Sequence, residues 1–126
     1  MSKPLQTICD VIPLKPGKLE AYKKFVAEFT GPRKKEYSEM LGRYGLRTVD
    51  VFYKKINDVE FVMVVHQADL DAREKLKNFT SANHPMEKWF LEQLTNLHYF
   101  EPLNGQPQAS ERLFSFVPLR KMGELL

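Results

Sequence analysis

The chain has 126 residues, of which 43% are hydrophobic and 28% are charged, with nine Phe, five Tyr and one Trp. This length suits one domain over residues 1–126, and the aromatic content excludes a disordered tail. The formal charge is only +3, and the one basic run, Arg33-Lys34-Lys35, is followed directly by Glu36. Nucleic-acid binders concentrate basic residues beside stacking aromatics, so we expect no nucleic-acid partner.

The location expected from the sequence is the cytoplasm. The longest apolar runs, such as Phe61 to Val65, are too short to cross a bilayer, so no membrane partner is expected. The first residues lack the features of a signal peptide. Cys9 is the single cysteine, which excludes an internal disulfide and a multi-cysteine zinc site.

The first half of the chain predicts a strand followed by a long, interrupted helix. Leu5 to Leu14 alternates and contains Ile and Val, as strands do, and Pro16-Gly17 supplies a corner. Apolar residues then recur at helical spacing from Lys18 to Tyr44. Pro32 removes the amide that would bond the carbonyl of Glu28, so we expect a kinked helix or two abutting helices.

The next segments predict a hairpin and a second helical region. Leu46 to Tyr53 and Val59 to Gln67 read as strands, and the short connection between them predicts an antiparallel hairpin. A second helical region opens at Asp69, breaks near residues 81–83 and restarts with Pro85 in its first turn.

The end of the chain predicts a last strand, which completes the fold. A loop rich in Asn, Gly, Gln and Pro runs from about Tyr99 to Ser110, and Arg112 to Leu119 reads as the final strand. The resulting order β-α-β-β-α-β is the α+β ferredoxin-like arrangement. It consists of a four-stranded antiparallel sheet with helices on one face.

Two-residue alternation sorts the strand residues into two sets. The apolar set, which we expect beneath the helices, contains Thr7, Cys9, Val11, Val49, Val51, Tyr53, Phe61, Met63 and Val65. The mixed set, which we expect on the other sheet face, contains Gln6, Ile8, Asp10, Ile12, Thr48, Asp50, Phe52, Glu60, Val62, Val64 and His66.

The mixed set is too apolar for a solvent face and too polar for a dry core. It suits a sheet that packs against a copy of itself around a partly hydrated cavity, so we expect a homodimer that forms an α+β barrel. Apolar burial at about 25 cal/mol per Å² can drive such an association. The alternative is a monomer with an open sheet face.

The segment Val11-Ile12-Pro13-Leu14-Lys15-Pro16-Gly17-Lys18-Leu19-Glu20 resembles the opening of an uncharacterised family of short bacterial proteins. The resemblance continues through Arg33 to Tyr37, the hairpin from Phe52 to Phe61, and His84-Pro85. It implies the dimeric α+β barrel superfamily, which includes L-rhamnose mutarotases, antibiotic-biosynthesis monooxygenases and haem-degrading monooxygenases.

The better-known branches of that superfamily fit this chain poorly. The positions of the catalytic His and Tyr of the mutarotases fall near Val26 and Val49 in this chain. A valine side chain can neither donate nor accept a proton. The iron-ligating His of the haem-degrading branch falls near Trp89. We therefore expect no cofactor.

The candidate catalytic residues are Asp10, Asp50 and His66, which the alternation places on one sheet face. A carboxylate and an imidazole there can act as general acid and base on a small substrate, with pKa values tuned by burial. Alternatively, these groups pair with one another, with the partner subunit or with water. No short ligand motif supports a metal, so none is expected.

The candidate ligand-binding residues are Thr48 and Phe52 of the same face, together with Trp89 and His84. The indole N–H of Trp89 needs a partner if buried, although the residue also fits a core position. His84 precedes Pro85 and equally suits a helix cap.

Two functions from different classes remain open. The first is a small homodimer that binds a compact organic molecule, acting as a cofactor-independent isomerase or monooxygenase. The second is a non-catalytic homodimer that binds a ligand or assembles.

Overall fold

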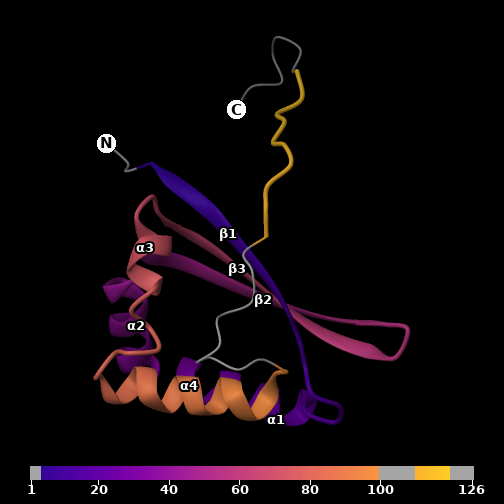
Figure 1. Cartoon of the computed structure of the whole chain (residues 1–126), viewed down its shortest axis with the longest axis vertical. Helices are drawn as coiled ribbons and strands as arrows, with labels where there is room; N and C mark the ends of the chain where they lie inside the picture. The colour runs from indigo at the N-terminus through magenta and orange to yellow at the C-terminus, as the bar shows by residue number, and fades with distance from the viewer. Residues whose placement is uncertain (1–3, 100–109, 120–126) are drawn as a thin grey trace.

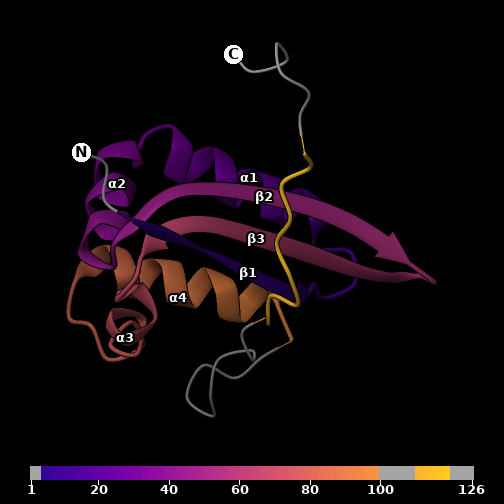
Figure 2. The same cartoon turned by 90° about the horizontal axis from the view of Figure 1, so that it is seen from above.

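Three strands form one antiparallel sheet in the computed structural model, which describes residues 4–99 and 110–119. The strands lie in the order β1-β3-β2, and the helices α1, α2 and α4 lie on one side of the sheet (Figures 1 and 2). The elements are β1 (Leu5–Pro13), α1 (Leu19–Thr30), α2 (Lys34–Arg43), β2 (Leu46–Ile56), β3 (Val59–Asp69), α3 (Ala72–Leu76) and α4 (Pro85–Leu97). The α+β class and the antiparallel hairpin are therefore confirmed.

The hairpin of β2 and β3 turns through two residues, and its tip projects beyond the helices (Figure 1). Asn57 and Asp58 both have positive φ, 48° and 68°, as the twist-matched two-residue turn requires. Ile56 and Val59 flank this turn and are each nearly half exposed. The tip is therefore held by its own ladder rather than by the core.

The interruption of the first helix is also confirmed. The helix α1 ends at Thr30 and α2 begins at Lys34. Pro32 has no amide to give to Glu28, and the amide of Arg33 donates to the carbonyl of Glu28 instead, at 3.0 Å. The last helix restarts at Pro85 as expected, because a proline in the first turn removes no helical hydrogen bond.

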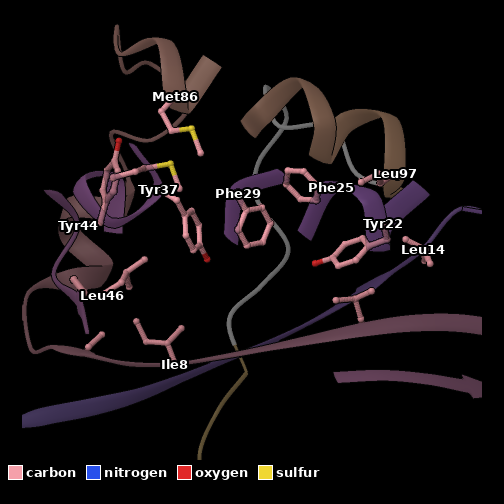
Figure 3. Packing of buried hydrophobic residues seen from close by; sticks show 14 residues of the cluster. Ile8, Leu14, Tyr22, Phe25, Phe29, Tyr37, Tyr44, Leu46, Met86 and Leu97 are labelled. Atoms are coloured by element: carbon pink, nitrogen blue, oxygen red, sulfur yellow. The ribbon is translucent and has the colours of Figure 1, made fainter. Parts of the chain in front are cut away.

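Aromatic rings on α1, α2 and α4 pack against one another on the side of the helices that faces the sheet (Figure 3). Ring centroids lie 4.9 Å apart for Phe25 and Phe29, 4.2 Å for Phe29 and Tyr37, and 4.9 Å for Phe25 and Phe90. On the sheet side, Ile8 is almost completely buried. This packing joins α1, α2 and α4 into one layer above the sheet.

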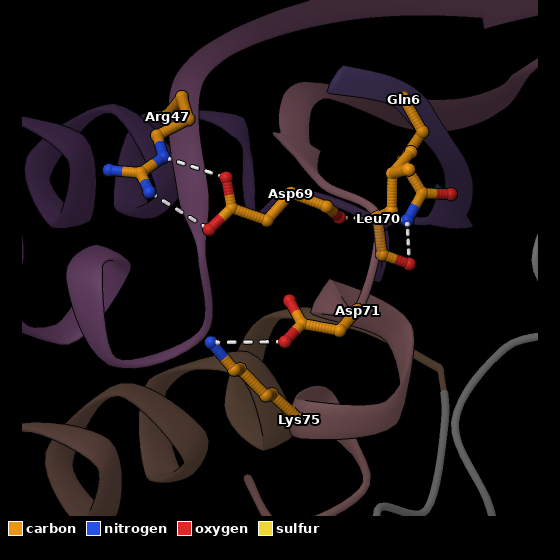
Figure 4. Close-up of polar contacts among 6 residues, drawn as sticks. All are labelled: Gln6, Arg47, Asp69, Leu70, Asp71 and Lys75. Carbon is orange, nitrogen blue, oxygen red and sulfur yellow. Dashed lines mark hydrogen bonds and ion pairs between the residues drawn. The ribbon is translucent and has the colours of Figure 1, made fainter. Parts of the chain in front are cut away.

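A network of polar contacts fastens the end of the sheet where β3 stops (Figure 4). The guanidinium of Arg47 makes two bonds of 2.9 Å to the carboxylate of Asp69, which is only 2% exposed. Gln6 donates to the carbonyls of Asp69 and Leu70 at 2.9 and 3.0 Å. The network ties β1, β2 and β3 together at this end.

The helix-side face of the sheet differs from the prediction in β1 and β3. The register pairs Ile8 with His66 and Asp10 with Val64, and the pocket lining puts all four residues on the helix side. The members of the apolar set in β1 and β3, including Cys9, were predicted beneath the helices. They lie instead on the face of the sheet opposite the helices. The prediction for β2 was right: Val49 and Val51 lie beneath the helices.

The prediction of which face of β1 and β3 lies beneath the helices was wrong because both alternating sets of these strands are rich in apolar residues. Alternation separates the two faces of a strand but does not say which face is covered. Polar residues in the mixed set indicate a face of the sheet that is exposed to solvent, whereas Asp10 and His66 lie in the wall of a pocket. The face opposite the helices is called the uncovered face below.

The final strand predicted at Arg112 to Leu119 is wrong as a strand of this sheet. Residues 110–119 pair with no described strand, and Phe114 and Phe116 are 82% and 72% exposed. The amide of Ser110 donates to the carbonyl of Cys9 at 3.3 Å, and the segment then leaves the sheet (Figure 1). Strand propensity selects an extended backbone, but a ladder needs a partner in register. Most of the predicted loop lies outside the described residues.

No helix in the described ranges is long and apolar enough to span a bilayer.

Candidate functional site

A pocket of about 580 Å³ lies between the helix-side face of the sheet and the helices. Its sheet wall includes Ile8 and Val64, and its helix wall includes Phe29, Met40 and Leu94. The two layers stand apart here because aromatic rings on α1, α2 and α4 pack against one another rather than into the sheet. A volume of this size is typical of sites for small organic molecules.

Two phenol groups from the helices reach this pocket. Tyr22 of α1 and Tyr37 of α2 line it, and their hydroxyls point toward the space above the sheet (Figure 3). Among the described residues the hydroxyls of Tyr44 and Tyr53 bond carboxylates, whereas those of Tyr22 and Tyr37 have no hydrogen-bond partner. Both are available to a bound molecule.

Burial also keeps these phenols protonated. It raises the pKa of Tyr37 to about 12. Burial, followed by the proximity of Tyr37, raises the pKa of Tyr22 well above its usual value. At neutral pH both groups are therefore neutral hydroxyls that can donate a hydrogen bond to a carbonyl or carboxylate oxygen.

Asp10 and His66 share the sheet wall of the pocket. Since Asp10 pairs with Val64 and Ile8 pairs with His66, the two titratable residues are diagonal neighbours on adjacent strands, roughly 7 Å apart. Asp10 has no hydrogen bond to any described residue, and the Nδ1 atom of His66 is buried without one. The two groups face the same space from one rigid surface.

The pocket shifts the two pKa values toward each other. Burial raises the pKa of the Asp10 carboxyl, and the positive charge of Arg73 partly offsets that rise. Burial lowers the pKa of the His66 imidazole. The raised pKa makes the Asp10 carboxylate a stronger base than an exposed one, and the lowered pKa keeps the His66 imidazole neutral at pH 7.

A basic side chain from α3 completes the polar lining. Arg73 lines the pocket and acts on Asp10 through its charge, and it makes no ion pair with a described residue. Lys77 and Thr80 follow it along the chain and line the same wall. Lys77 forms an ion pair with Glu74 at 2.9 Å, so Arg73 is the better anion partner of the two.

His98, which sequence analysis did not select, also lines the pocket. It is 1% exposed, and its Nδ1 atom lies 3.1 Å from the carbonyl oxygen of Pro13. Its ring makes an edge contact with Tyr22 at 5.5 Å. Burial lowers the pKa of His98, against the effect of the Pro13 carbonyl. The available signal was its helical spacing from Leu94, an apolar position of α4.

The other candidate residues lie away from this pocket. Asp50, Thr48 and Phe52 occupy the uncovered face, as their pairing with residues 65, 67 and 63 shows. The structure therefore brings Asp10 and His66 together and separates Asp50 from both.

The two remaining candidates lie on or beside α4. His84 is the N-cap residue of α4 but makes no side-chain capping bond, and it is exposed. Trp89 packs on Phe25, and the guanidinium of Arg33 lies over its ring at 4.3 Å. Trp89 therefore has a structural environment outside the pocket.

The described residues group no three His, Cys, Asp or Glu side chains in a way that could hold a metal ion.

No protein-family model matches the sequence, and the search of curated proteins also finds no match.

Proposed function

We propose that this protein binds a compact, largely apolar organic molecule in the pocket between the sheet and the helices. The supporting observation is a cavity of about 580 Å³ whose apolar walls carry the free hydroxyls of Tyr22 and Tyr37. Such sites combine apolar lining with a few polar groups that orient the ligand. The expected ligand has an aromatic or aliphatic body and an oxygen atom that accepts from the phenols.

The first test is mass spectrometry of small molecules that remain bound to the purified protein. A matched pair of variants on one strand gives the control, since Val64 faces the pocket and Val65 faces the other way. Val64→Phe fills the cavity and should remove the bound molecule, whereas Val65→Phe adds the same volume outside it and should retain binding. Equal occupancy in both variants would contradict the pocket as the binding site.

A second candidate function is proton transfer on that ligand, as in a cofactor-independent isomerase. It is favoured by Asp10 and His66, which share one wall of the pocket and whose pKa values burial moves toward each other. Asp10 accepts a proton from a carbon or hydroxyl of the substrate, and a phenol donates to the oxygen that becomes negative. Asp10→Asn should abolish exchange of substrate protons with D₂O while leaving binding intact; a non-catalytic binding protein would show no exchange in either form.

We further propose that the protein is a homodimer of the α+β barrel type, as the resemblance implies. The uncovered face exposes Phe52 at 53% and Val11 at 44%, beside the apolar neighbours Cys9, Phe61 and Met63. Contiguous apolar surface of this kind commonly marks an interface. In this arrangement each pocket lies behind its own sheet, so it is complete within one copy.

Light scattering during size-exclusion chromatography tests the dimer. Phe52→Asp places a charge on the uncovered face and should shift the mass to that of one chain. Leu70→Asp is the control, because Leu70 is 63% exposed and lies beyond the end of β3. A wild-type protein with the mass of one chain at all concentrations would contradict the dimer.

A further inference from the structure

The segment 110–119, called the arm below, carries five large apolar side chains that the described residues leave uncovered. Each is between 72% and 98% exposed; they are Leu113, Phe114, Phe116, Val117 and Leu119. Two aromatic positions separated by a single residue are unusual on a free surface. The arm therefore has the composition of a buried strand without a place in its own sheet.

The arm begins at one edge of the sheet and departs on the uncovered side. The amide of Ser110 donates to the carbonyl of Cys9 on β1, at 3.3 Å, and no other described strand pairs with this edge of β1. The chain then runs away from the face that is opposite the helices (Figures 1 and 2). Ten extended residues span about 33 Å, and stacked sheets lie about 10 Å apart, so the arm can reach a second sheet.

The opposite edge of the sheet offers an apolar groove. The groove has a volume of about 250 Å³ and lies between α1 and β2. Its lining includes Leu19 and Val26 of α1 and Val51 and Tyr53 of β2. The outer edge of β2 pairs with no other described strand, so its amides and carbonyls are open to an added strand.

We propose that the arm of one copy docks on a second copy of this chain, along the free edge of its β2. In that position Phe114 and Phe116, which alternate to the same side of an extended chain, enter the groove between α1 and β2. The two arms of a dimer would bury four Phe side chains, at about 150–250 Å² each. This is a large share of the roughly 1,600 Å² of a standard interface.

A second copy fits better than the arm's own groove for a geometric reason. The arm starts at the β1 edge and on the uncovered side, whereas its own groove lies beside β2 and on the helix side. When two sheets face each other across a two-fold axis parallel to the strands, the β1 edge of one copy lies over the β2 edge of the other. This inference rests on the proposed dimer and adds to it a residue-level contact.

Disulfide trapping between two differently tagged chains tests the contact. Both chains carry Cys9→Ser, one carries Phe116→Cys and the other carries Val26→Cys, so a link can form only between copies. Co-expression followed by mild oxidation should give a linked heterodimer. Its yield should exceed by at least tenfold that of a control in which Lys88→Cys, exposed on α4, replaces Val26→Cys.

The dissociation constant of the full-length dimer gives a second readout. Phe114→Ser combined with Phe116→Ser should weaken dimerisation at least tenfold, while Leu70→Ser, also highly exposed, should leave it unchanged. If the two Phe→Ser substitutions do not weaken dimerisation and no disulfide forms between copies, the arm contact is refuted, although the dimer itself is not. A link seen only when both cysteines are on one chain would show that the arm occupies its own groove and would also overturn the proposal. A wild-type monomer would remove the proposed dimer and the arm contact together.

Discussion

Replacing Asp10 by Asn is expected to stabilise the protein while removing the proposed proton acceptor. Asp10 is partly buried, it has no hydrogen-bond partner among the described residues, and its pKa is raised because burial disfavours the charge. Asn keeps the polarity of the side chain and removes only the charge, and a difference of one pKa unit between the folded and unfolded states corresponds to about 1.4 kcal/mol. Because Asp10 retains some solvent contact and the charge of Arg73 nearby, we expect a gain of about 1 kcal/mol.

The gain should depend on pH in a defined direction. Since the folded pKa of Asp10 lies above its unfolded value, near 3.9, the folded state holds more protons than the unfolded state between the two values. The stability of the wild type therefore falls as pH rises through this window. Asn does not titrate, so the difference between variant and wild type should be smallest near pH 4 and reach its full size at pH 7.

Thermal and urea unfolding followed by circular dichroism, between pH 4 and pH 8, measure this difference. A gain of 1 kcal/mol corresponds to a rise in Tm of about 4 °C for a domain of this size. Asp50→Asn, on the uncovered face, is the matched control and should change stability by less than about 0.5 kcal/mol. A loss of stability in Asp10→Asn, or a gain that does not vary with pH, would refute the account of a strained carboxylate in the pocket wall.

Two further substitutions test the framework around the site. Gly45→Ala should cost about 2 kcal/mol in urea unfolding, because Gly45 has φ +70° and an added Cβ would lie 2.9 Å from a carboxylate oxygen of Asp69; a change below 0.5 kcal/mol would contradict this. Glu87→Gln should cost about 2 kcal/mol, since Glu87 is 1% exposed and accepts hydrogen bonds from Arg43 and Tyr44. Burial alone would raise the pKa of Glu87, but these bonds hold it below its ordinary value, so the stabilisation it gives is present above about pH 4.5 and is lost as pH falls through the lowered pKa. Unfolding curves of wild type and Glu87→Gln should therefore converge on acidification, and curves that stay apart would contradict the ion pair.

Most element positions were predictable because they depend on local physics. Pro32 and Pro85 fix where helices break and begin, through the amide that proline lacks. The hairpin turn follows from Asn57 and Asp58, which tolerate positive φ better than most residues. These signals act within a few residues of chain and need no knowledge of the partner surface.

The candidate site was only half predictable for a different reason. Alternation correctly placed Asp10 and His66 on one face, because their strands pair in simple register. It failed for Asp50, because the two-residue turn pairs Ile56 with Val59 and therefore Asp50 with Val65, and neither strand alone indicates this register. Tyr22 and Tyr37 fall at apolar positions of the helical pattern from Lys18 to Tyr44, which predicts core packing. They line a pocket because the helix layer stands away from the sheet at this point. That separation depends on tertiary packing and cannot be read from the spacing of residues along one helix.

The irregularity in β2 determines how the chain tolerates insertions and deletions. The extra residue, Arg47, lets Leu46 stay in the core while Thr48 and the residues after it keep their faces. Removing one residue from this strand would exchange the faces of either Leu46 or the whole remainder of β2, and would detach the guanidinium that holds Asp69. Length changes at this point should therefore be rejected, whereas the hairpin tip, which supports nothing beyond itself, should accept them.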